Sequence, residues 1–140
     1  MTTLEVAHAK AGKDLLAALV PALTVYDGKL PDNVTTVTRP YVLLYSAVEW
    51  EWDNPNGSLL HESSSCVTTF YAHCVGENDT ACGAVAGRVR SAWLDVMPVV
   101  AGRVCGPIRL VSVQPPFQDN NLGVAVLDVI AIYEYESRPA

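Results

Sequence analysis

The sequence of 140 residues is poor in charged side chains, which make up 17% of it against about 25% in a typical soluble domain. It contains no apolar run near the ~20 residues that a membrane-spanning helix needs. Its first residues lack the basic start and apolar stretch of a secretory signal. These absences predict a soluble, cytosol-made protein with no membrane partner. The length favours one domain over residues 1–140.

Hydrophobic residues, by contrast, make up 50% of the chain, and its mean hydropathy is positive at +0.21. That content exceeds what one small core needs. Burial of apolar surface between the subunits of an oligomer would account for the excess.

Basic residues are missing from the middle of the chain. No Lys or Arg lies between Arg39 and Arg88, whereas six of the 15 acidic residues do, so this segment holds the whole net charge of −6. A surface that grips phosphates needs basic side chains, so we do not expect the segment to bind nucleic acid. It is either a solvated acidic loop or a surface that repels DNA or docks on a basic partner.

Apolar periodicity predicts two helices, at residues 4–20 and from an N-cap at Asp79 or Thr80 to about Pro98. Alternation predicts strands at 41–48, 65–75, 108–113 and 124–135, with a short extended piece at 25–33 and a loop at 114–121. This order predicts an α+β fold of two layers: a mixed, mostly antiparallel sheet with two main helices packed on one face.

The pattern also predicts details of packing. In the first helix the expected buried stripe consists of Leu4, Ala11, Leu15, Ala18, Leu19 and Ala22. Gly83 and Gly87 lie one turn apart in the second helix, and they predict a close approach of another backbone. In the last strand Asp128 and Glu134 predict a half-exposed face.

The residues that could carry chemistry form no recognisable catalytic, metal or cofactor site. The cysteines are too widely spaced for a paired zinc motif, so we expect small buried hydrophobic residues at Cys66, Cys74, Cys82 and Cys105. His61 and Glu62 precede three serines on an extended stretch, where neighbouring side chains diverge, and no nucleophile elbow accompanies them. For His73 to bind a metal, a second ligand would have to come from a neighbouring strand. We therefore expect no enzyme activity, metal or cofactor.

An acidic hairpin carries the candidate functional residues. Acidic and Trp side chains alternate just before a strong turn signal at 54–57. The two Trp residues either cap the core or anchor a protein interface. The candidate interface or lumen residues are Glu49, Trp50, Glu51, Trp52, Asp53, His61 and Glu62.

The whole order resembles the tail terminator (tail completion) proteins of long-tailed bacteriophages. The segments that carry the resemblance are Leu-Val-Pro-Ala-Leu at 19–23, Val-Tyr-Asp-Gly-Lys-Leu-Pro at 25–31, Arg-Pro-Tyr-Val-Leu-Leu-Tyr at 39–45, Phe-Tyr-Ala-His-Cys-Val-Gly at 70–76, the helix at 81–97 and the closing strand at 124–135. The resemblance implies a non-enzymatic virion protein of the tail or neck, assembled in the host cytoplasm without a cofactor.

The resemblance also implies partners. Such a subunit forms a homo-hexameric ring on the last ring of the tail tube protein, stops tube polymerisation and offers a joining surface to the head connector or stopper protein. DNA passes through the ring without specific binding. We expect the hairpin at 49–62 to face either the lumen or an axial partner ring. The alternatives are another neck component, such as a head-completion or connector protein, a small cytosolic α+β enzyme, and a dimeric binding module.

Overall fold

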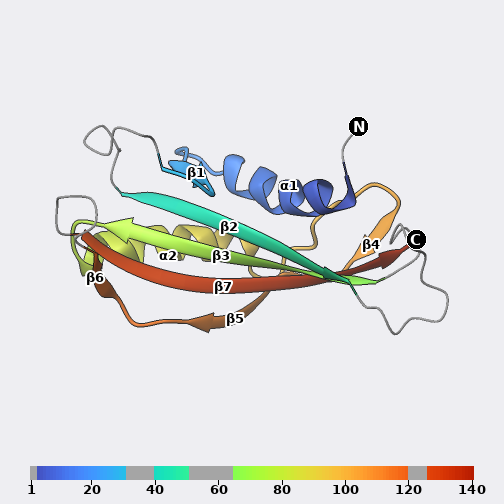
Figure 1. Ribbon diagram of the computed structural model, residues 1–140. Coiled ribbons are helices and arrows are strands. Elements are labelled where there is room, and N and C mark those ends of the chain that lie inside the picture. The colour runs from blue at the N-terminus through green and yellow to red at the C-terminus, as the bar shows by residue number, and fades with distance from the viewer. Residues whose placement is uncertain (1–2, 31–39, 51–64, 120–125) are drawn as a thin grey trace.

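The computed structural model describes residues 3–30, 40–50, 65–119 and 126–140 (Figure 1). Its elements follow the predicted order closely. They are α1 (Leu4–Ala17), β1 (Val25–Asp27), β2 (Tyr41–Trp50), β3 (Cys66–Gly76), α2 (Asp79–Trp93), β4 (Arg103–Cys105), β5 (Arg109–Val113), β6 (Phe117–Asp119) and β7 (Val126–Pro139).

The long strand β7 organises a seven-stranded sheet. One of its edges pairs with β3, and its other edge takes β6, β5 and β4 in turn along its length. β2 continues the sheet beyond β3, and β1 pairs with β2 in parallel, with Val25 opposite Val42. Every other pairing is antiparallel, so the predicted mixed, mostly antiparallel sheet is confirmed.

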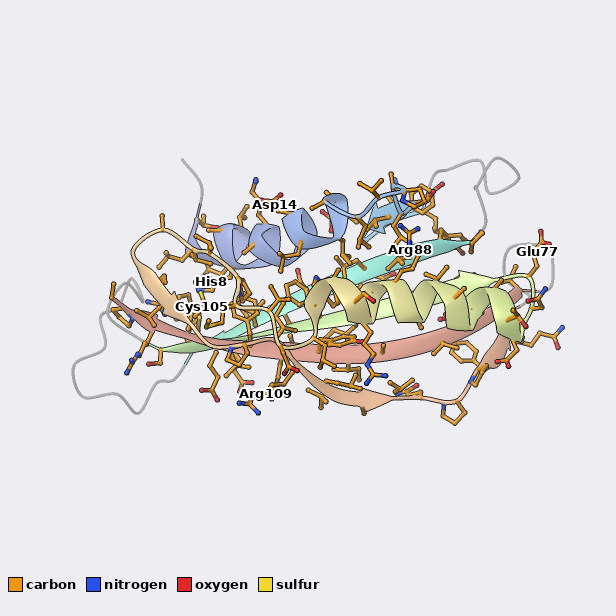
Figure 2. The ribbon with its side chains drawn as sticks, turned by 180° about the vertical axis from the view of Figure 1, so that it is seen from behind. His8, Asp14, Glu77, Arg88, Cys105 and Arg109 are labelled. Carbon is orange, nitrogen blue, oxygen red and sulfur yellow. The ribbon has the colours of Figure 1, made fainter. Side chains whose placement is uncertain are left out.

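Both helices cover the same face of the sheet, as the view from behind shows (Figure 2). Alternate residues of the three long strands point into one core with them, because side chains of a strand alternate between its two faces. The aromatic centre of that core is a stack of Phe70 on Trp93, with ring centroids 4.8 Å apart, and on Tyr135 at 6.0 Å. The predicted two-layer α+β fold is confirmed. We call the opposite side of the sheet the outer face.

The buried side of α1 differs from the predicted stripe. His8, Gly12 and Leu16 face the core one turn apart, whereas Ala18 is exposed and lies beyond the end of the helix. A Cβ atom at Gly12 would lie 2.3 Å from Cζ of Phe70, so the ring occupies the place of a side chain. Trp93 also donates its indole N–H to the Gly12 carbonyl at 2.9 Å. The prediction was right for Ala11, which is buried, and for Leu15 and Leu19, which pack partly buried against the core. It missed His8 and Gly12, because neither residue type reads as apolar.

The helix α2 carries the predicted apolar stripe, with Cys82, Val85, Val89 and Trp93 buried. Its N-cap is Asn78, whose side chain accepts a hydrogen bond from the Ala81 N–H at 2.8 Å, so the predicted caps were one and two residues too late.

The close approach expected at Gly83 and Gly87 is wrong within the described part of the chain. Both glycines are exposed, and no atom lies within 4 Å of a Cβ built on either. The opposite side of the helix packs against the sheet, because it carries Cys82, Val85 and Val89 at helical spacing.

Two further differences concern β7 and its neighbours. The expected loop at 114–121 contains the short strand β6, which pairs with the start of β7. Asp128, expected on a half-exposed face, is only 5% exposed, and its Oδ2 lies 2.9 Å from His73 Nδ1 on β3. A cross-strand partner explains how a carboxylate can be buried there, because a buried charge needs a hydrogen-bonded partner.

Candidate interaction surfaces

The candidate residues Glu49 and Trp50 end β2 and point to opposite faces of the sheet. Glu49 is exposed, whereas Trp50 is 9% exposed and lies against α1. The alternation expected from the sequence therefore holds at this pair. The other candidates lie outside the described residues: Glu51, Trp52, Asp53, His61 and Glu62.

Trp50 packs among residues of α1 and β4. Its indole N–H donates to Oε1 of Glu5 at 3.2 Å, and its ring meets that of His8 edge to face, with centroids 6.2 Å apart. The Arg103 guanidinium carbon lies 5.8 Å from the Trp50 ring centroid, within the range of a cation–π contact. Of the two interpretations of the Trp pair, the core-capping one describes Trp50.

A buried polar network continues from Trp50 into the sheet. His8 is fully buried: its Nδ1 lies 2.6 Å from the Leu4 carbonyl oxygen and its Nε2 lies 2.6 Å from the Ser137 hydroxyl. Arg103 donates to the same hydroxyl from Nε at 3.1 Å and from Nη2 at 3.0 Å. The Cys66 Sγ lies 3.3 Å from that hydroxyl as well. The network joins α1, β3, β4 and β7, elements that are far apart in the sequence.

This network contains a Ser, a Cys and a His within hydrogen-bond distance, which is the composition of a nucleophile and its base. Burial lowers the pKa of His8, so the ring is neutral at pH 7, donates from Nδ1 to Leu4 and accepts at Nε2 from Ser137. All three side chains are at most 3% exposed, and two Arg103 donors occupy the acceptor side of the Ser137 hydroxyl. The arrangement is therefore better suited to stabilising the fold than to reacting with a substrate.

Sequence reasoning did not find this network. His8 lies within a helix, Ser137 near the end of the last strand and Arg103 in a linker, and no motif connects them. The only local signal was that His8 lies on the side of α1 away from Lys10, Lys13 and Asp14.

The cysteines behave as the sequence predicted. All four are free; Cys66, Cys74 and Cys82 are buried and Cys105 is half-buried. Burial, followed by the charge of Asp128, raises the pKa of Cys74 to about 12, and burial likewise raises the pKa of Cys82 and of Cys105. Thiols with raised pKa values are weak nucleophiles. Within the described residues, no three His, Cys, Asp or Glu side chains gather as a metal would require.

In the part of the chain that the structure describes, no helix covers the outer face, which presents aromatic side chains in its middle and acidic side chains toward one end. Tyr45 and Tyr71 are cross-strand neighbours and are 43% and 39% exposed. Glu49 and Glu136 lie on either side of Val67 in register, and Glu134 lies two residues before Glu136 on the same face of β7. This face is an accessible surface with acidic side chains at the end that leads to the hairpin segment.

Comparison with solved structures finds chains that share this fold. A chain from the structure titled "Virion of native gene transfer agent (GTA) particle" superposes with a TM-score of 0.70, covering 92% of each chain at 14% identity. A second solved structure, of a protein without a descriptive name, matches with a TM-score of 0.58 at 17% identity over 96% of this chain and 92% of the other. At these identities the likeness shows a shared fold.

Sequence comparison adds no further relative: no protein-family model and no curated protein matches the chain. In the described part of the chain, neither helix has the length and apolar content to cross a membrane.

Proposed function

We propose that this protein is a structural subunit of a phage-like virion and, within it, a tail terminator: a ring that caps the tail tube, stops its growth and presents the surface to which the head joins. The observation that carries the proposal is the fold shared with a chain of a gene transfer agent virion over 92% of both chains. The sequence resemblance to tail terminators supports the same role independently.

The exposed apolar residues of the subunit suit a ring. Val6, Val111, Val113 and Phe117 are all more than two-fifths exposed although the core is well filled elsewhere. Large exposed apolar patches mark interaction surfaces in most proteins. A ring subunit buries such surfaces on two neighbours, which accounts for the low charge content of the chain.

The acidic segment suits a lumen or an axial docking surface. Glu49 and Glu136 are exposed on the outer face, next to the point where the hairpin segment with Glu51 and Asp53 begins. An acidic lining repels the phosphates of passing DNA. A protein of this design conducts DNA instead of binding it, and it needs no catalytic residue or cofactor.

Co-assembly with the tail tube protein of the same virus or element tests the role. Tubes grown with this protein present should stop at the length set by the rest of the tail, and negative-stain images should show a ring on one end. Growth of uncapped tubes of unlimited length would overturn the proposal. Rings that bind only the isolated head connector would instead favour a head-completion protein.

Charge reversal tests the acidic segment separately. Glu49→Lys, Glu51→Lys and Asp53→Lys together should impair DNA ejection or the stacking of the ring on its partner. The matched control reverses three exposed acids elsewhere, Glu77→Lys, Asp79→Lys and Asp95→Lys, with the same change in net charge. Equal infectivity of the two triple variants would exclude a role of the hairpin in either step.

A further inference from the structure

Two unlike surfaces lie open at opposite edges of the same sheet. At one edge, β1 pairs only with residues 42–44 of β2, so within the described residues no strand covers the edge of β2 at 46–50. At the other edge, β5 pairs with β7 and all five of its residues are exposed (Figure 1). A subunit cannot join these two edges to each other, because the sheet lies between them.

The β2 edge borders an apolar groove of about 410 Å³. We call it the α1–β2 groove; its walls are Glu5, Val6, Ala9, Lys10 and Lys13 of α1 and Ser46, Ala47 and Val48 of β2. Both lysines are already neutralised, because Lys10 bridges to Asp14 and Lys13 to Asp27, each at 2.7 Å. Val6, on the α1 side of the groove, is 55% exposed. The groove therefore offers apolar surface on the side of the sheet that carries the helices.

The β5 edge offers apolar side chains on that same side. Leu110 lies opposite Tyr133 in register and Val113 opposite Ala131, and both of these β7 residues point into the core under the helices. Leu110 is 39% and Val113 is 53% exposed. The ladder shifts register between Leu110 and Ser112, so side chains, more than a regular run of backbone hydrogen bonds, are suited to make a contact here.

The charges on the outer face of the two edges are opposite in sign. Exposed Arg109 lies at the start of β5, opposite Glu134 of β7, and exposed Glu49 lies near the end of β2. A contact between the edges would bring Glu49 of one copy toward Arg109 of the next.

We propose that the β5 edge of one copy packs into the α1–β2 groove of the next copy, so that identical subunits join head to tail. The inference rests on the proposed function in one respect: a ring supplies the repeated copies. A contact between two different surfaces builds a closed ring or an open chain, whereas a contact of a surface with itself stops at a dimer. The surfaces named here are therefore of the kind that a ring requires.

Cysteine cross-linking tests the contact in the full-length protein. In a Cys105→Ser background, which leaves three buried cysteines, Val6→Cys and Val113→Cys are prepared as separate variants and mixed before mild oxidation. The mixture should give a cross-linked dimer, and either variant alone should not. Val20→Cys mixed with Val99→Cys is the matched control, since these residues are 93% and 89% exposed but belong to neither surface. The test mixture should exceed the control about tenfold in dimer yield, because a specific contact raises the local thiol concentration.

The experiment is run on the protein with its tail tube and is read together with negative-stain images of the sample. Rings with the cross-link support both proposals. Rings without a cross-link above the control overturn the β5–groove contact and leave the tail terminator role standing. A cross-link without rings overturns the ring and leaves the contact as that of an open chain. Dimers formed by Val113→Cys alone would replace the head-to-tail contact by a contact of β5 with itself.

Discussion

Two regions along β7 contrast: at Ser137, near its end, the strand is enclosed by a polar network, and in its middle it pairs with β5, whose apolar side chains are exposed. At the first place His8, Arg103 and Trp50 connect α1 to the sheet, and both the hydroxyl and the carbonyl of Ser137 are hydrogen-bonded. At the second, apolar side chains remain in solvent. The comparison teaches that burial within the subunit, and not hydrophobicity, separates residues that hold the fold from residues available to a partner.

The most direct test of this contrast is to truncate one apolar residue in each region. Trp50→Ala should lower the free energy of unfolding by about 3–5 kcal/mol, because it opens a cavity beside His8. Val111→Ala, on β5, should change it by less than about 0.5 kcal/mol. Urea denaturation followed by tryptophan fluorescence measures both, and circular dichroism checks Trp50→Ala for folding. Similar losses in the two variants would show that β5 belongs to the folding core.

The next largest effect on stability is expected from glycine substitutions in the two helices. Gly12→Ala should destabilise by about 1–3 kcal/mol although Ala favours helix, because Phe70 stands where the methyl group would go and is held by Trp93 and Tyr135. Gly87→Ala should stabilise by about 0.5–1 kcal/mol, because open space surrounds that position. Thermal unfolding of the pair provides the measurement. A stabilising Gly12→Ala would mean that α1 does not pack on Phe70 in this way.

The His8 network predicts a dependence of stability on pH. Its pKa lies below the ordinary 6.5 in the folded state, so the unfolded chain takes up the proton first as pH falls, and stability declines below about pH 6.5. Between about pH 7.5 and about pH 5.5, the free energy of unfolding should fall more in the wild type than in His8→Asn.

The control for this prediction is Thr3→Ala, which removes the N-cap that accepts from the Val6 N–H at 3.2 Å. It should cost about 1 kcal/mol at both pH values, because no titration is involved. An identical pH dependence of the wild type and His8→Asn would place the proton uptake elsewhere.

The smallest expected effect concerns β5 itself. Val113→Lys should leave the unfolding free energy within about 0.5 kcal/mol of the wild type, because the side chain is already in solvent. The same variant should fail to assemble on tail tubes if β5 joins neighbouring copies. Size measurement by light scattering, with and without tubes, compares the two outcomes. A variant that folds and assembles normally would show that this edge contacts no neighbour.

Much of the fold followed from local patterns. The stripe from Cys82 to Trp93 defined α2, and alternation defined the three long strands to within a few residues. Of the candidate residues, the pattern placed Glu49 and Trp50 on opposite faces of the strand correctly. It could not choose between core and interface for Trp50, because that choice depends on Glu5, His8 and Arg103, which lie about 40 to 50 positions away in the chain.

The sequence by itself determined the types and order of the two helices and the long strands, because the periodicity of helix and strand is visible in neighbouring residues. The short strands β4 and β6 were not predicted. Only the tertiary structure decided which side of α1 is buried, since a glycine suits that side solely when a ring such as Phe70 lies opposite. It also decided that His8 and Ser137, 129 positions apart, share a hydrogen bond. Pairing at such a distance depends on how the sheet brings strands together, and no local pattern encodes it.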